Sequence, residues 1–432
     1  MHSGEDSARG RLTRRLGELM QRQGHNRTTL AAATTFKRPQ ISEAVAGKQV
    51  PSANLIKALD RVLNAGGELI SMWKDVRLEV LRQDLDTELP GGRATKGAET
   101  DRREVVELGA LAVAAGLAGE VSRRIAGGDP DPLTLDELDE RLDQIGTAYT
   151  TTPHAVLTPL IVGGWRDVER LLDGRLSGRV RGRLTLVAGL YAFYAGRLAF
   201  NIGDDAAARR FASLAELYAR DVADPLLSGS VATLQTSIAY YTGRHTAAAD
   251  IAAQARHGAH PYLRARLAAY EARARAAAGQ HEQARQSLRD VQDAVWLGEP
   301  MVGTEPFGEE LVHTFVAVVS GRLGDGELAE PHARRSLTIL KATGGGYEDI
   351  GGTYNALAQA FLRRAQPDPE QAADAASAAL AVLEGRPTRT VIQRSGQIWQ
   401  ELGARGEGQR AVAELGERLQ AHRRALPAGS SG

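Results

Sequence analysis

Five turns between residues 203 and 367 recur 36 to 45 residues apart, and each is followed by the same spacing of small residues. The turns centre on Gly203, Gly243, Gly279, Gly324 and Pro367, and the residues five, nine and twelve positions later are mostly alanine. Small residues at this spacing let two antiparallel helices approach closely across each turn. The pattern therefore predicts helix pairs that stack into an all-α superhelix with a concave inner face.

This repeat resembles the tetratricopeptide repeat family, whose basic unit of 34 residues would be lengthened here by loops. The early positions of the family motif survive best as Ala195-Gly196 and Phe200. The resemblance implies a TPR-like α-solenoid over residues 101–428. We expect a last helix pair around Gly406 to cap the array.

Residues 28–52 form a second pattern, in which two short helical segments flank a tight turn. Helices are expected over 28–34 and 38–46. In the second helix the apolar residues Ile41, Ala44 and Val45 share one face, which predicts that this face is buried. Its polar side chains would then point outward: Arg38, Gln40, Ser42 and Glu43.

From Leu30 to Ser52 this stretch resembles the Xre-type (phage-repressor-like) helix-turn-helix family, especially its actinobacterial members. The resemblance implies a scanning helix over 28–34 and a DNA recognition helix over 38–46. The sequence departs from the family at Thr35, where glycine is usual. Apolar stripes on both sides of the motif complete a five-helix domain over residues 1–85.

Positive charge is concentrated in this region, although the whole chain has 53 basic and 53 acidic residues. Residues 9–48 contain nine basic residues and only two acidic ones, which is the charge distribution expected of a DNA-binding module. We expect Arg38 and Gln40 to read bases. The full set of predicted DNA-binding residues is Arg14, Arg15, Thr28, Lys37, Arg38, Gln40, Ser42, Glu43 and Lys48, of which Arg14, Arg15, Thr28 and Lys48 are assigned to phosphates.

Residues 86–100 are polar and glycine-bearing without apolar periodicity, and they predict a flexible linker. The apolar run Val105–Gly119 follows Arg102-Arg103, as in a twin-arginine export signal. It lies behind a DNA-binding module and is short of the ~20 residues that span a bilayer, so a buried connecting helix is expected instead. The predicted location is the cytoplasm.

The order of parts resembles the RRNPP group of peptide-sensing regulators. That resemblance implies a solenoid that forms a homodimer and binds an effector, a peptide or small molecule, in its groove. The loop 296–308 either folds over this groove or only bridges two repeats. Each residue predicted to face the groove and contact the effector could instead be inter-repeat core. These predicted groove positions are Phe193, Arg197, Phe200, Asn201, Thr233, Ser237, Tyr240, Tyr241, Arg273, Tyr354 and Phe361.

Catalytic and metal-binding patterns are weak. The chain has no cysteine, and His245, His257 and His260 lack the spacing of a metal-binding helix. The glycine-rich run 344–352 has no Gly-Lys-Ser/Thr and so predicts a loop rather than a phosphate cradle. We therefore expect no enzyme activity, no cofactor and no metal.

The sequence as a whole predicts a transcriptional regulator that binds double-stranded operator DNA, an inverted repeat, as a homodimer. An effector bound in the solenoid would modulate it. The alternative is a protein-interaction scaffold or anti-activator whose helix-turn-helix no longer reads DNA.

Overall fold

The computed structural model describes residues 7–76 except 35, 37, 48–50, 52 and 74, residues 128–404 except 297, 299, 384 and 385, and residues 410–425. The chain divides into two compact units, Met1–Gly109 and Ala110–Gly432. All regular elements within these described ranges are helices, which confirms the predicted all-α fold class. The predicted linker 86–100 and the run Val105–Gly119 lie outside the described residues.

None of the helices that the structure describes is long and apolar enough to cross a membrane.

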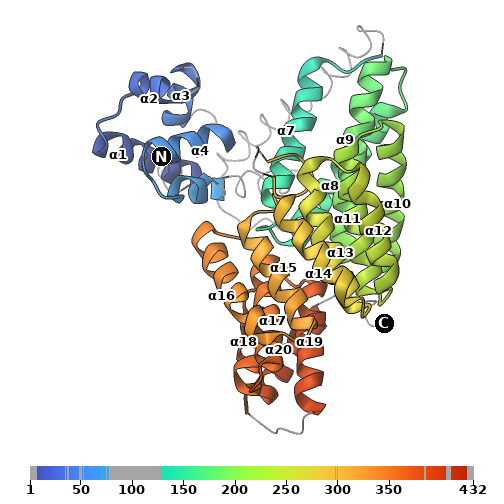
Figure 1. Ribbon diagram of the computed structural model, residues 1–432. Coiled ribbons are helices and arrows are strands. Elements are labelled where there is room, and N and C mark those ends of the chain that lie inside the picture. Colours follow the sequence, from blue (N-terminus) through green and yellow to red (C-terminus); the bar gives the residue numbers. More distant parts are fainter. Residues whose placement is uncertain are drawn as a thin grey trace, which may run out of the picture. The chain divides into compact units, whose positions relative to one another are not determined.

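The N-terminal unit contains a helix-turn-helix preceded and followed by further helices (Figure 1). Residues 68–73 and 75–76 are also helical, in agreement with the predicted five-helix domain. Both helices of the motif end one residue earlier than predicted, and the first also begins one residue earlier. The bounds are α1 Ala8–Arg22, α2 Arg27–Ala33, α3 Arg38–Val45 and α4 Ala53–Val62.

A small apolar core holds these helices together. Leu30 of α2 and Ile41 of α3 are fully buried, and apolar side chains of α1 and α4 complete the cluster. Gly47 ends α3 with φ +65°, and a Cβ at this position would lie 2.8 Å from Thr13 Oγ1. Glycine is therefore needed at this turn both for its backbone conformation and for the close approach of α1.

Two polar contacts anchor the C-terminal end of this domain. The buried Asp60 carboxylate accepts hydrogen bonds from the backbone N–H groups of Gly67 (2.8 Å) and Leu69 (3.0 Å). The indole of Trp73 donates to the backbone carbonyl of Pro51 at 2.6 Å. The Asp60 contacts fix the residues after α4 to α4 itself, and the Trp73 contact ties them to the segment that follows α3.

The C-terminal unit is an array of helices connected by short turns (Figure 1). Each helix packs against its neighbours in sequence, as expected of a helical repeat solenoid. Its helices are α7 Pro132–Ala148, α8 His154–Leu172, α9 Gly178–Ile202, α10 Asp205–Asp221, α11 Pro225–Tyr241, α12 His245–Gly258, α13 Pro261–Ala277, α14 His281–Asp293, α15 Glu309–Arg322, α16 Gly326–Thr343, α17 Tyr347–Arg363, α18 Pro369–Ala381, α19 Arg389–Ala404 and α20 Arg410–Ala425.

The predicted turns separate the helices of five pairs. Gly203, Gly243, Gly279 and Gly324 have φ between 75° and 90°, a conformation that favours glycine. The small residues after the turns face inward: Ala208, Ala212, Ala215, Ala248, Ala252, Ala284, Ala329, Ala333, Ala372, Ala376 and Ala379 are all buried. The pairing of helices is thus confirmed, whereas membership of the tetratricopeptide family stays a prediction.

The first helix of each pair forms the inner layer of the array. Helices α9, α11, α13 and α15 are buried along most of their length, whereas their partners α10, α12, α14 and α16 bury only a narrow stripe. A helix that is buried on nearly all sides lies in the interior of a fold. Polar residues on the first helices must therefore find partners within the array.

The two ends of the array contact each other. Asn201 of α9 donates to Glu348 of α17 at 2.7 Å, and the hydroxyl of Tyr347 lies 2.9 Å from His154 Nε2. Gln393 of α19 donates to the backbone carbonyl of Tyr241 at 3.3 Å. These contacts join the first repeats to the last across the concave face.

The role of the small residues in close helix packing can be tested with two adjacent alanines on α12. Ala248 is fully buried and Ala247 is exposed. Replacing Ala248 with Leu should lower the free energy of unfolding by about 1–3 kcal/mol, because the added atoms would force α11 and α12 apart. Urea unfolding measures this, and Ala247→Leu is the control. Equal effects for the two variants would contradict the packing.

Candidate functional site

The helix-turn-helix motif is shaped by local capping. Asn26 Oδ1 accepts hydrogen bonds from the backbone N–H groups of Thr28 and Thr29, both at 2.9 Å, and the Thr29 hydroxyl accepts from the N–H of Asn26 at 2.8 Å. This reciprocal capping box starts α2. At the other end, Thr34 is extended with φ −120°, so the chain leaves α2 and turns toward α3.

Several predicted DNA-binding residues lie on the surface of this domain. Arg38 is exposed at the start of α3, whereas Ser42 and Glu43 on the same helix are half-buried. Arg14 and Thr28 are exposed on α1 and α2. The remaining predictions cannot be placed: Lys37 and Lys48 lie outside the described residues, as does the side chain of Gln40 in α3.

Arg15 and Arg27 have partners that sequence reasoning missed. Arg15 contacts Glu68 through Nε and Glu18 through Nη1, each at 2.9 Å. A phosphate bound by Arg15 would therefore compete with two carboxylates. Arg27, at the start of α2, contacts the hydroxyl of Ser42 at 3.3 Å and links the two helices of the motif.

The C-terminal unit contains a partly open cavity of about 140 Å³. Its walls come from the first helices of the pairs, α9, α11, α13, α15, α17 and α19, together with Thr304 of the loop before α15. Most of the predicted groove positions meet here, and they come from three different helices. These residues are Phe193, Arg197, Phe200, Asn201, Thr233, Ser237, Tyr241 and Arg273.

Three predicted groove positions do not line this cavity. The ring of Tyr240 packs against Arg273 and borders a smaller neighbouring cavity. The hydroxyl of Tyr354 accepts a hydrogen bond from Lys341 Nζ at 2.8 Å, and its ring packs beside the core of the last repeats. Phe361 is buried in that same core. The groove assignment is wrong for Tyr354 and Phe361, because α17 presents Glu348, Asp349 and Gly352 to the cavity instead.

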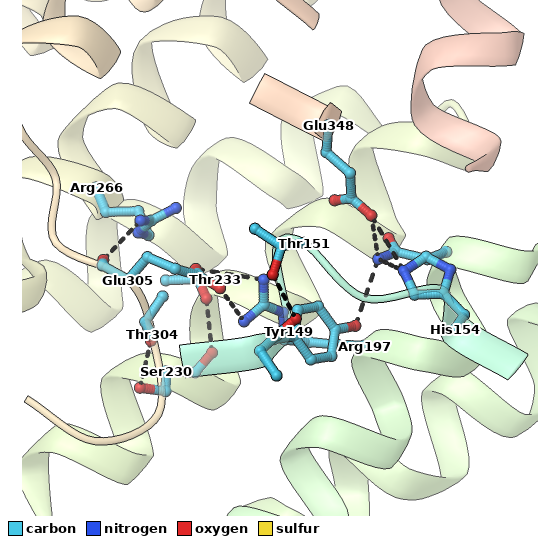
Figure 2. A network of polar contacts seen from close by, with 12 residues as sticks. Tyr149, Thr151, His154, Arg197, Ser230, Thr233, Arg266, Thr304, Glu305 and Glu348 are labelled. Atoms are coloured by element: carbon cyan, nitrogen blue, oxygen red, sulfur yellow. Dashed lines mark hydrogen bonds and ion pairs between the residues drawn. The ribbon is translucent and has the colours of Figure 1, made fainter. Parts of the chain in front are cut away.

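The loop before α15 reaches into the array. Glu305 forms two contacts with the guanidinium of Arg197, at 2.9 and 3.3 Å, and its backbone carbonyl accepts from Arg266 at 2.8 Å (Figure 2). The neighbouring Thr304 contacts Ser230 through their hydroxyls at 2.9 Å. The loop therefore lies across α9, α11 and α13, which favours the first of its two predicted alternatives, folding over the groove, over only bridging two repeats.

Asn201 is the centre of a second polar network. Its side-chain amide lies 2.7 Å from Glu348 Oε1, 3.3 Å from His154 Nε2 and 3.4 Å from the hydroxyl of Tyr149 (Figure 2). Asn201 and Arg197 thus border the cavity, as predicted, but their polar atoms already have partners within the protein. Their main role in this structure is to join α9 to the loop and to α17.

The cavity is electrostatically uneven. Burial raises the pKa of Glu305, but the charges of Arg197 and Arg266 lower it more, so this carboxyl has a pKa below its ordinary value. For Asp349 the balance is the reverse, because burial and the charge of Glu305 raise its pKa by more than the charge of Arg266 lowers it. Burial and the neighbouring charge of Glu305 raise the pKa of Asp349 to about 7, against a usual value of 3.8.

Sequence reasoning missed four charged residues that line this cavity: Arg266, Glu348, Asp349 and Arg394. Arg266 lies two helical turns before Arg273 on α13, and could have been found by extending the same helix face. The others depend on contacts between segments far apart in the chain, which no local pattern indicates.

Comparisons with known proteins bear on the N-terminal unit. Residues 11–73 match the family described as helix-turn-helix domain. No curated protein matches the chain. The matched segment contains α1 to α4 and the helical residues that follow, so the N-terminal unit holds a helix-turn-helix domain, a fold typical of DNA-binding regulators.

The raised pKa of Asp349 predicts a pH dependence of stability. Between pH 4 and about 7 the folded protein keeps a proton on Asp349 that the unfolded chain releases, so stability should fall as pH rises through this window. Asp349→Asn should remove this part of the slope, at most about 4 kcal/mol. Urea unfolding of both proteins from pH 5 to 8 measures it, and parallel pH profiles would refute the assignment.

Proposed function

We propose that this protein is a sequence-specific DNA-binding transcriptional regulator whose N-terminal domain reads an operator and whose C-terminal array binds an effector. The observation that carries the proposal is the match of residues 11–73 to helix-turn-helix domains, together with an exposed Arg38 at the start of α3. In such domains the second helix of the motif enters the major groove with its N-terminal residues against the bases.

Base readout is assigned to Arg38 and Gln40. The guanidinium of Arg38 can donate two hydrogen bonds to O6 and N7 of guanine, and the amide of Gln40 suits N6 and N7 of adenine. The exposed positions Arg14 on α1 and Thr28 on α2 suit phosphate contacts. The position of Arg27 beside Ser42 adds one more cation to this surface.

Effector binding is assigned to the partly open cavity of the C-terminal unit. Its volume of about 140 Å³ and the contacts between α9 and α17 favour a small molecule or a single side chain over an extended peptide. A ligand held there would contact several first helices at once. Binding would therefore change how tightly the two ends of the array are joined, which is the kind of two-state element that effector control requires.

Removal of Arg38 should separate specific from non-specific binding. Arg38→Ala should weaken binding to the operator by about 1–3 kcal/mol while leaving binding to random DNA nearly unchanged, because base contacts are lost and phosphate contacts remain. Genome-wide occupancy first identifies the operator, and fluorescence anisotropy then measures both affinities.

The control for that experiment is Arg209→Ala, since Arg209 is an exposed arginine on α10 of the other unit. Equal weakening on operator and random DNA would contradict the base readout assigned to Arg38. Failure of the unaltered protein to bind any promoter fragment at low salt would favour an interaction scaffold instead.

Dimerisation is expected from the size of the DNA-binding domain. One helix-turn-helix of this size reads only a half-site, and useful specificity usually requires two half-sites about one helical turn apart. The full-length protein should therefore sediment as a dimer and protect an inverted repeat. A monomer bound to one half-site, measured by analytical ultracentrifugation with operator DNA, would overturn this part of the proposal.

A further inference from the structure

The cavity of the C-terminal unit holds two groups of arginines with different surroundings. Arg197 and Arg266 both contact Glu305. Arg273 lies about two helical turns beyond Arg266 on α13, and Arg394 enters the same cavity from α19. Among the described residues, neither Arg273 nor Arg394 forms an ion pair with a carboxylate.

Arg273 has the geometry of an anion receptor. Its side chain is only 7% exposed, and its Nε and Nη2 atoms have no hydrogen-bond partner in the part of the chain described. These two N–H groups share one edge of the guanidinium, and that edge matches the two oxygens of a carboxylate or phosphate.

Aromatic rings hold the guanidinium of Arg273 in place. Its central carbon lies 4.3 Å from the ring centre of Tyr240 and 4.6 Å from that of Tyr270. Such contacts stabilise the cation and restrict the orientation of its plane. They supply no hydrogen-bond acceptor for the N–H edge, so the donors on that edge stay unpaired.

Arg394 adds a second positive charge nearby. Burial lowers the pKa of Arg394, and the charges of Arg273 and Arg322 lower it further. Its Nη1 atom lies against Gly352 of α17, since a Cβ on this glycine would be 3.5 Å away. A buried cation and a half-buried one that repel each other are costly unless an anion lies between them.

We propose that this cavity binds a small molecule through an oxyanion, a carboxylate or a phosphate group, held by Arg273 and Arg394. The aromatic and apolar walls, including Phe315 and Leu234, would contact the rest of the ligand. This inference names the ligand class for the effector site of the proposed function and rests on that proposal only for its effect on DNA binding.

The test is a thermal-shift titration of the full-length protein with sodium phosphate, sodium succinate and sodium chloride at equal ionic strength. One of the two oxyanions should raise the melting temperature by about 3 °C or more above the chloride value. The anion that does so identifies the source of the oxyanion. Equal shifts in all three salts would overturn the proposal.

Variants locate the site. Arg273→Met should lose most of the anion-dependent shift, with affinity by calorimetry falling about tenfold or more. Arg394→Met provides a second, independent variant if the first does not fold. The matched control is Arg335→Met, which removes an exposed arginine of α16 that pairs with Glu309 outside the cavity. The control should keep the full shift.

If the two arginines bind an anion, Arg273→Met and Arg394→Met should each melt no lower than the unaltered protein when anion is absent, because an unpaired charge is removed. A purely structural role for the arginines predicts the opposite, a lower melting temperature for the variants. Anion shifts that persist in both variants would place the anion elsewhere, for example on the basic N-terminal domain, and would overturn the proposal. The titration contains no DNA, so its outcome is independent of whether the protein binds an operator.

Discussion

The contact between the two ends of the helical array is the constraint on which the rest of the C-terminal unit depends. Asn201 of α9 and Glu348 of α17, together with His154 and Tyr347, join the first repeats to the last. A solenoid without this contact would present its inner helices to solvent along an open groove. Because the ends meet, polar residues of several inner helices face one partly open cavity. Each of these polar groups needs a hydrogen-bond partner there, because a buried polar group without one lowers the stability of the fold.

Local patterns predicted much of the fold, and long-range contacts explain what they missed. The glycine turns and the alanines behind them indicated the helix pairs correctly, because a turn and its two helices lie within one short segment. The Asn201–Glu348 contact joins residues 147 positions apart, and the Arg197–Glu305 contact joins residues 108 apart. A periodic sequence pattern gives no information about contacts between residues so far apart in the chain. Neither the contact between the two ends of the array nor the acidic partner of Arg197 was therefore predicted. The error at Tyr354 has the same origin, since closure decides which face of α17 turns inward.

The arginines of the cavity illustrate how differently one residue type can be used within one space. Arg197 is held by a two-point contact with Glu305, which fastens the loop before α15 to α9. Arg266 binds the backbone of the same loop. Arg273 is held only by aromatic rings, which stabilise its charge but leave its donors unused. Arg197 and Arg266 therefore hold the loop in place, whereas the aromatic contacts of Arg273 leave two of its donors without a partner among the described residues.

Closure also decides the direction in which a ligand would act. Arg273 belongs to α13 and Arg394 to α19, and they border one cavity because the array curls until its last helices approach its first. An oxyanion that contacts both guanidiniums would bind tightly only when the two ends of the array are joined. A ligand shifts the equilibrium between joined and separated ends by its difference in affinity for these two states. Such a ligand would therefore favour closure. If closure changes operator affinity, the operator must change ligand affinity by the same factor, because the coupling free energy belongs to both sites.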